Sequence, residues 1–164
     1  MSLLDKEPVQ KVQRALKKFD EELEIITLET SARTAVEAAK SLKCDVGAIV
    51  KSLLFKSEKE FYLCLVSGDK RCSLNKLKKI INTKDFSMAN PEEVKKITGY
   101  TIGGVSPVGY DNSIKIIIDN SLSRFKSVFG AAGHPNCVFG IKFEDLIKIT
   151  KGTIEDIVEW DNQN

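Results

Sequence analysis

One lysine stands inside an apolar run, and it is the residue of this sequence whose chemistry most needs an explanation. The run extends from Val46 to Phe55, and its part from Ile49 to Phe55 is rich in β-branched and large aliphatic residues. Such residues favour a buried strand, where an unpaired ammonium is costly. The sequence therefore predicts that Lys51 reaches either water or an anion.

Two glycine-rich segments downstream are the places where an anion could be held. The first runs from Ile102 to Gly109, and the second runs from Phe129 to Pro135 and carries His134, the only histidine of the chain. Glycine permits positive φ angles and lets a ligand approach the backbone, while a proline stiffens a loop. We therefore expect Lys51 and the two segments to form one site.

Composition bounds the class of protein. The chain has 164 residues, of which 42% are hydrophobic and 29% charged, as expected of one globular domain, residues 1–164, with a sizeable core. It contains no apolar stretch near the roughly 20 residues that span a bilayer, and its first residues lack a signal-peptide pattern. We expect a cytoplasmic protein that does not act on membranes.

The net charge of the chain does not by itself indicate a nucleic-acid partner. The formal net charge is +2, whereas dedicated nucleic-acid binders are usually strongly basic. Basic residues do gather in two clusters, 11–18 and 70–79. Solvated helix faces are the simpler interpretation of each cluster, and contact with phosphates is the alternative.

Periodicity and turn signals predict a mixture of helices and strands. Asn90, Pro91 and Glu93 form a helix start, which Gly99 ends, and Ser31 is the expected cap of an earlier helix. Hairpin-length gaps favour an α+β fold, a single mixed and largely antiparallel sheet or partly closed barrel with helices around it. The helices are expected near 8–19, 31–42, 74–81, 90–99 and 143–147, and the extended segments near 24–28, 49–56, 61–66, 114–118, 128–131, 138–141 and 153–158.

The order of these motifs resembles the YbaK-like family, which includes the editing domain inserted in bacterial prolyl-tRNA synthetases and its free-standing relatives. The resemblance covers roughly Val9 to Ile157. It rests on the segments 34–39, 49–53, 103–107 and 118–122, and on the turn 133–135. It implies the YbaK-like fold and hydrolysis of incorrectly aminoacylated tRNA, with the acceptor end of tRNA as partner and no cofactor.

The resemblance also implies roles for individual residues. Lys51 matches the functional lysine of the family, and anchoring the terminal adenosine phosphate is favoured over action as a general base. The loop of Gly103, Gly104, Val105, Ser106 and Pro107 would bind the ester carbonyl or the adenosine. Gly133 and His134 would border the aminoacyl pocket, where the histidine selects the amino acid, orients water, or is an ordinary turn residue satisfied by the backbone. Asp119 also matches, but a capping role is expected there.

Other chemistries find less support in the residues. A zinc site usually needs several Cys or His ligands, and this chain has one histidine. Ser106 lies in no G-x-S-x-G turn, and no cysteine has a recognisable activating context. The four cysteines form no C-x-x-C pair and are expected to be buried free thiols.

The leading hypothesis is therefore a deacylase that acts in trans on mischarged tRNA, including tRNA-Pro. It would need a weak complex with a synthetase, or acceptance of several tRNAs, to recognise the tRNA body. The alternative is a non-catalytic module that holds a tRNA end, a nucleotide or a synthetase in the same groove. Alanine, serine, cysteine and other small amino acids are all compatible with the sequence, and the oligomeric state stays open.

Overall fold

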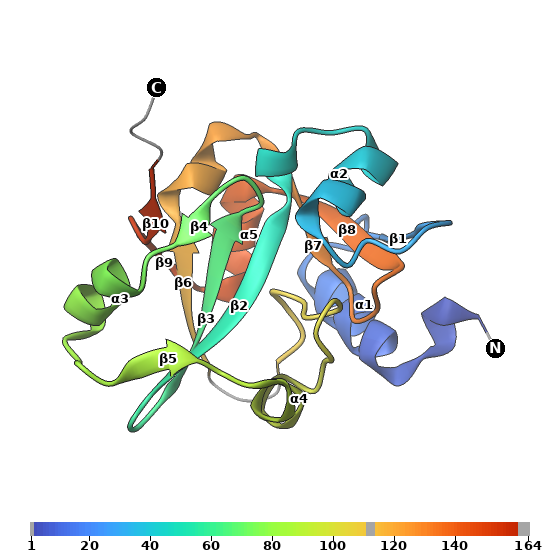
Figure 1. Ribbon diagram of the computed structural model, residues 1–164. Coiled ribbons are helices and arrows are strands. Elements are labelled where there is room, and N and C mark those ends of the chain that lie inside the picture. Colours follow the sequence, from blue (N-terminus) through green and yellow to red (C-terminus); the bar gives the residue numbers. More distant parts are fainter. Residues whose placement is uncertain (1, 111–113, 161–164) are drawn as a thin grey trace.

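The structure, a computed structural model, describes residues 2–110 and 114–160 (Figure 1). Its α-helices are α1 (Glu7–Phe19), α2 (Ala35–Leu42), α3 (Leu74–Ile81), α4 (Pro91–Thr98) and α5 (Phe143–Thr150). Its strands are β1 (Ile25–Thr27), β2 (Val50–Ser57), β3 (Phe61–Ser67), β4 (Arg71–Cys72), β5 (Phe86–Met88), β6 (Lys115–Asp119), β7 (Ser127–Ala131), β8 (Cys137–Lys142), β9 (Thr153–Glu155) and β10 (Val158–Glu159). The predicted α+β class is confirmed, and none of the described helices is long and apolar enough to cross a membrane.

The described strands form three sheets rather than one. The largest has the order β5-β2-β3-β6-β9, the second β1-β8-β7, and the third joins β10 to β4. The predicted β2–β3 hairpin is antiparallel, with Lys51 opposite Val66. β6, in contrast, lies parallel to both β3 and β9, because the chain that leads from β3 to β6 is long enough to make the crossover that a parallel pair requires.

Helix starts follow local capping chemistry. As predicted, Asn90 caps α4: its side chain accepts a hydrogen bond from the Glu93 N–H, and the Glu93 carboxylate accepts one from the Asn90 N–H. The predicted cap of α2 was wrong, since the helix begins at Ala35 and Thr34, not Ser31, is its cap. The reason is the capping box, because Glu37 lies at the third helical position after Thr34 and bonds back to it.

Two cores lie on the two faces of the β2–β3 hairpin. Val50 and Leu54 belong to the first, which α1 closes with its buried side chains. Phe55 and Val66 belong to the second. Since side chains alternate along a strand, Lys51 shares the face of Leu53 and Phe55 and borders the second core.

Candidate functional site

A cavity of about 380 Å³ lies beside the first half of β2. Its lining residues come from the start of α2 and the segment before it, from β2 and the residue before it, from the end of β5 through α4 to the loop that follows, and from β7 and β8. Figure 1 shows where these elements lie in the fold. Its lining is mainly apolar, with Arg33 and Lys51 as the charged residues. The lining residues are Ala32, Arg33, Thr34, Ala35, Ala38, Ile49, Val50, Lys51, Ser52, Leu53, Leu54, Met88, Ala89, Val94, Ile102, Gly103, Val105, Phe129, Gly130, Ala131 and Val138.

The cavity exists because β2 is paired incompletely on one side. β3 accompanies β2 from Val50 to Lys56, but β5 pairs only with the segment from Phe55 to Ser57. The Leu54 carbonyl accepts a hydrogen bond from Ala89 N–H at 2.9 Å, which shows which residues face this edge. Alternate residues of an antiparallel strand point their backbone groups to the same edge. The N–H and C=O of Ser52 therefore point toward the cavity.

The side chain of Ser52 adds a second polar feature at this edge. Its hydroxyl oxygen is buried and has no hydrogen-bond partner among the described residues. Ser31, which directly precedes the lining residue Ala32, has a similarly unpartnered hydroxyl. A buried hydroxyl without a partner is unfavourable, so these groups are available to a ligand or to water.

Lys51 lines the cavity and is half-buried. Its ammonium donates to the backbone carbonyl of Lys70, in the turn between β3 and β4, and no carboxylate of the described residues lies within 4.0 Å of it. Burial lowers the pKa of Lys51 from its ordinary value of 10.5 and outweighs Cys72 and Asp69, which raise it, while the Arg71 guanidinium acts in the same direction as burial. An ammonium without a charged partner at the rim of a cavity is suited to an anionic ligand.

The first glycine loop contributes two of its five predicted residues to the lining. Gly103, with φ of +97°, and Val105 border the cavity. Gly104, Ser106 and Pro107 are buried behind them. There the Gly104 N–H donates to the Thr101 carbonyl and the Ser106 hydroxyl accepts from Val108 N–H at 3.1 Å. These two groups are therefore already used to hold the loop.

Pro107 packs against β7. A Cβ atom on Gly130 would lie 3.0 Å from the Pro107 ring, so the loop and the strand approach each other closely. Pro107 thus shapes the cavity from behind, since Gly130 is part of the lining.

The second glycine segment lines the cavity with Phe129, Gly130 and Ala131, but Gly133 and His134, its two residues predicted for the site, do not line it. Gly133 N–H donates to the Gly104 carbonyl at 3.0 Å. His134 is half-buried, and its Nδ1 accepts a hydrogen bond from Asn136 N–H at 3.0 Å. Burial lowers the pKa of His134 below its ordinary 6.5, and Lys6 and Arg33 act in the same direction. The lowered pKa favours the neutral imidazole, whose Nδ1 is already used by the Asn136 N–H within the same turn.

Asp119 has the capping role expected from the sequence. It is fully buried, accepts from Ser121 N–H at 2.8 Å and also accepts from Ile157 N–H at 2.7 Å. Both carboxylate oxygens are thus engaged with the backbone. Asp119 ties the end of β6 to the segment before β10.

Sequence reasoning missed several residues of the lining. Ser52 directly follows Lys51, and its role depends on which strands lie beside β2. Arg33 lies just before α2, and Val94 and Val138 come from α4 and β8. The only sequence signal for Arg33 is its place next to the capping box of α2.

The lining offers the Lys51 amine and the hydroxyls of Thr34 and Ser52 as reactive groups, but no carboxylate, imidazole or thiol. The lining residues include no Asp, Glu, His or Cys. Within residues 2–110 and 114–160, no three such side chains gather as metal ligands. The four cysteines are free, with Cys64 and Cys137 buried and Cys44 and Cys72 half-buried. Any reaction in the cavity must therefore depend on how the substrate is positioned, on the charges of the lining, and on its backbone and hydroxyl groups.

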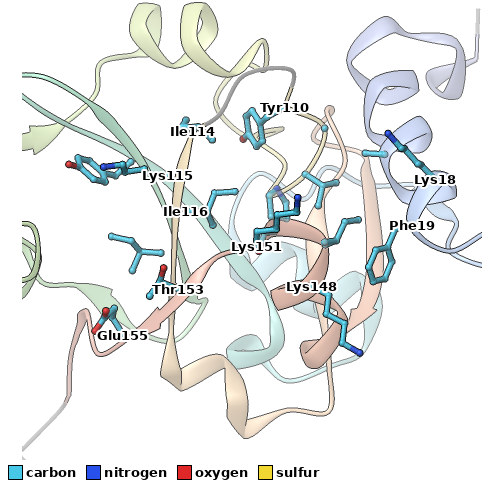
Figure 2. A pocket seen from close by; sticks show the side chains of 18 of the residues that line it. Lys18, Phe19, Tyr110, Ile114, Lys115, Ile116, Lys148, Lys151, Thr153 and Glu155 are labelled. Carbon is cyan, nitrogen blue, oxygen red and sulfur yellow. The ribbon is translucent and has the colours of Figure 1, made fainter.

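A second and larger hollow, of about 1140 Å³, lies over β6, α1 and the end of α5 (Figure 2). Lys18, Lys115, Lys148 and Lys151 stand around it, with isoleucines and Phe19 between them. Of the residues predicted for the site, only Pro107 borders this hollow. The smaller cavity is therefore the candidate functional site.

Comparison with known proteins identifies the family of this chain. The aminoacyl-tRNA editing domain family matches residues 29–149, and the chain belongs to that family. This range contains every residue that lines the cavity.

Three relatives illustrate the similarity. The uncharacterized protein YwhH of Bacillus subtilis (strain 168) is 30% identical over 146 residues, which cover 87% of this chain and 92% of YwhH. The proline–tRNA ligase of Caldicellulosiruptor bescii is 32% identical over 124 residues, 75% of this chain but only 21% of the ligase. A solved structure, described as a candidate trans-editing enzyme for prolyl-tRNA synthetase, is 36% identical, with a TM-score of 0.89 over 94% of this chain and 99% of that one.

Proposed function

We propose that this protein hydrolyses, in trans, the ester that joins a small amino acid to the end of a mischarged tRNA, and that tRNA-Pro is among its substrates. The observation that carries the proposal is the cavity at the open edge of β2, in a chain of the editing domain family. Its volume of about 380 Å³ is at the lower end for ligand sites. An aminoacyl group with a small side chain fits such a space.

The cavity would hold the amino acid by shape. Val94, Phe129 and Val138 form apolar walls, which suit a short aliphatic side chain and offer no partner to a charged one. The ester would then lie near Ser52, where polar groups reach the cavity edge. Size and polarity together would select small, uncharged amino acids.

Lys51 would bind the terminal phosphate of the tRNA. A lysine ammonium has three N–H donors, so Lys51 can keep its hydrogen bond to the Lys70 carbonyl and still offer donors to an anion. Its position at the rim fixes the ester relative to the cavity. Positioning of this kind is what an activated ester requires for hydrolysis.

Hydrolysis would proceed by attack of a bound water on the ester carbonyl. The tetrahedral intermediate carries an oxyanion, and the Ser52 N–H at the cavity edge is a donor for it. The bond from carbonyl carbon to ribose oxygen then breaks, so the amino acid leaves as a free acid and the ribose hydroxyl regains its proton. This role of the backbone accounts for a lining without a carboxylate, histidine or cysteine.

Action in trans is supported by the lengths of the relatives. YwhH and the candidate trans-editing enzyme match this chain over nearly their whole length. On this proposal residues 1–164 are one editing domain that works in the cytoplasm, where tRNA is charged. A synthetase would supply recognition of the tRNA body.

The proposal is tested with purified protein and tRNAs charged with alanine, serine, cysteine or proline. We expect hydrolysis of at least one ester of a small amino acid, and loss of it in a Lys51→Ala variant. Binding of these tRNAs without hydrolysis of any of them would instead support the non-catalytic module.

A further inference from the structure

Trp160, the only tryptophan of the chain, lies at the surface close to Lys51. Its relative solvent-accessible surface is 44%. It follows β10, which is fixed to β4 by the pairs Val158–Cys72 and Glu159–Arg71. Continuing this register sets Trp160 opposite Lys70, and the Lys70 ammonium lies 4.1 Å from the centre of the indole ring.

The surroundings of this indole are cationic. Arg124 lies 5.9 Å from the ring centre, but Asp69 accepts two hydrogen bonds from it and balances its charge. Lys70 and Arg71 have no carboxylate within 4.0 Å among the described residues, although the Lys70 ammonium, after Arg124, helps to lower the pKa of Asp69 and Glu159 is the cross-strand partner of Arg71. We call Trp160, Lys70 and Arg71 the Trp160 platform.

The platform is joined to the candidate site through one residue. The Lys70 ammonium lies over the indole ring of Trp160, and the Lys70 carbonyl accepts a hydrogen bond from the Lys51 ammonium. The turn from Ser67 to Lys70 that carries both contacts is closed by a backbone hydrogen bond of 3.0 Å. A ligand that reaches Lys51 from the side of this turn therefore passes the indole.

An exposed aromatic ring beside lysine and arginine side chains is an arrangement that binds single-stranded nucleic acid, because bases stack on the ring and phosphates contact the cations. An acidic protein segment would use the cations but not the flat face of the indole. The position next to Lys51 also agrees with a polymer whose last phosphate ends there. These observations favour RNA over a protein partner.

We propose that the Trp160 platform binds the unpaired 3′ end of the tRNA, with one base stacked on Trp160 and its phosphate held by Lys70 and Arg71. The inference rests on the proposed function, since it takes the cavity to hold the aminoacyl end of the same strand. It assigns a recognition surface whose three residues do not line the cavity, and whose aromatic residue, Trp160, lies outside residues 29–149.

The single tryptophan makes the test direct. The probe is a short, uncharged single-stranded RNA that ends in CCA, added to the full chain while tryptophan fluorescence is recorded. We expect saturable quenching, since stacking brings a base against the only indole. Binding of the same RNA, labelled and followed by anisotropy, should weaken roughly tenfold in Trp160→Ala and change little in Trp160→Phe, which keeps an aromatic ring.

Matched variants test the cations. Lys70→Ala and Arg71→Ala should each weaken RNA binding and reduce its dependence on salt concentration. Lys79→Ala, an exposed cation of α3 outside the platform, should bind as the unaltered protein does. Thermal melting of each variant establishes that the fold is retained.

Three results would overturn the inference. They are unchanged RNA affinity in a folded Trp160→Ala variant, RNA binding without any change in fluorescence, and quenching by hexaglutamate at the same concentrations as by RNA. The probe carries no ester, so these results are independent of hydrolysis. Protein that hydrolyses aminoacyl-tRNA while Trp160→Ala leaves KM unchanged contradicts the platform alone, and protein that binds the RNA but hydrolyses nothing contradicts the proposed function alone.

Discussion

Gly104 and Gly133 bring the two glycine-rich segments into backbone contact. Gly133 N–H donates to the Gly104 carbonyl at 3.0 Å, and a Cβ atom on Gly104 would lie 2.8 Å from the backbone nitrogen of His134. Glycine is required at position 104 because there is no space for a side chain, not because of an unusual φ. Segments that lie almost thirty residues apart in the sequence thereby support one wall of the candidate site.

A Gly104→Ala substitution tests this contact. The added methyl group must push the 133–134 backbone away, so we expect the free energy of unfolding to fall by about 1–3 kcal/mol. Chemical denaturation measures the change. An unaltered unfolding midpoint would show that the two loops separate at little cost and that their contact does not define the wall.

Gly103→Val is expected to impair the site itself. Gly103 has φ of +97° and lines the cavity, with Arg33 and Pro135 at 3.5 Å from a Cβ in this position. A β-branched side chain is strained at this φ and projects at the cavity wall, so substrate binding and turnover should both fall. Deacylation assays over a range of substrate concentrations measure both quantities.

Gly99→Val is the control for backbone strain. Gly99 ends α4 with φ of +82° and lies outside the cavity lining. Both variants should lose stability, but only the Gly103 variant should lose activity beyond what its folded fraction explains. Equal activity per folded molecule in the two variants would remove Gly103 from the site.

Lys51→Ala should reduce deacylation by about a hundredfold while the protein stays folded. The ammonium is the charged group at the rim on the side of Lys70, and a hydrogen bond to a charged group contributes about 1.5–3 kcal/mol. Lys56→Ala is the control, because Lys56 lies on the same strand and pairs instead with Glu93 at 2.7 Å, outside the cavity. Single-turnover rates that are alike for the two variants would exclude a role for Lys51.

Ser52→Ala should separate stability from function. Its hydroxyl has no partner among the described residues, so its removal should leave the melting temperature unchanged or raise it slightly. If the substrate uses this hydroxyl, deacylation should fall by up to about tenfold, the value of one neutral hydrogen bond. Ser121→Ala removes another buried hydroxyl without a partner among the described residues, one that lies outside the lining, and should keep its activity; parallel losses in both variants would argue against a specific contact.

His134 should make folding stability depend on pH below about 6.5. Its pKa is lowered in the folded protein, so the stabilisation that depends on neutral imidazole is present above the unfolded-state pKa near 6.5 and is lost as the pH falls through the folded-state pKa. Protonation of Nδ1 also removes the acceptor of the Asn136 N–H. The measurement is the free energy of unfolding between pH 7.5 and 5.

The His134→Gln variant lacks this titration, so its stability should vary less than that of the unaltered protein over the same range. Because His134 lies outside the cavity lining, we expect the variant to keep the order of preferred amino acids. A changed order would instead assign the imidazole to selectivity, the role that the family resemblance implies.

Local patterns predicted the elements that hold the site. The β2–β3 hairpin follows from two apolar runs joined by a short polar connection, and α4 follows from its cap, its first-turn proline and Gly99. α5 begins where expected but continues to Thr150. These features depend on neighbours in the sequence, so the sequence is sufficient to predict them.

Features that depend on distant segments were not predictable in this way. β5 is short, with one buried residue, and its pairing with β2 depends on tertiary contacts. That pairing stops at Phe55 and leaves the edge at Ser52 open, and no residue near Ser52 in the sequence indicates this. The parallel position of β6 likewise depends on the path of a long crossover.

Deacylation of alanyl-tRNA-Pro and its seryl, cysteinyl and prolyl counterparts by the purified protein tests the central claim most directly. We predict that the protein releases at least one small amino acid much faster than spontaneous hydrolysis does, and that Lys51→Ala loses this activity while Lys56→Ala keeps it. No acceleration with any of these esters, from folded protein that still binds the tRNA end, would contradict the account and leave the cavity as a binding site.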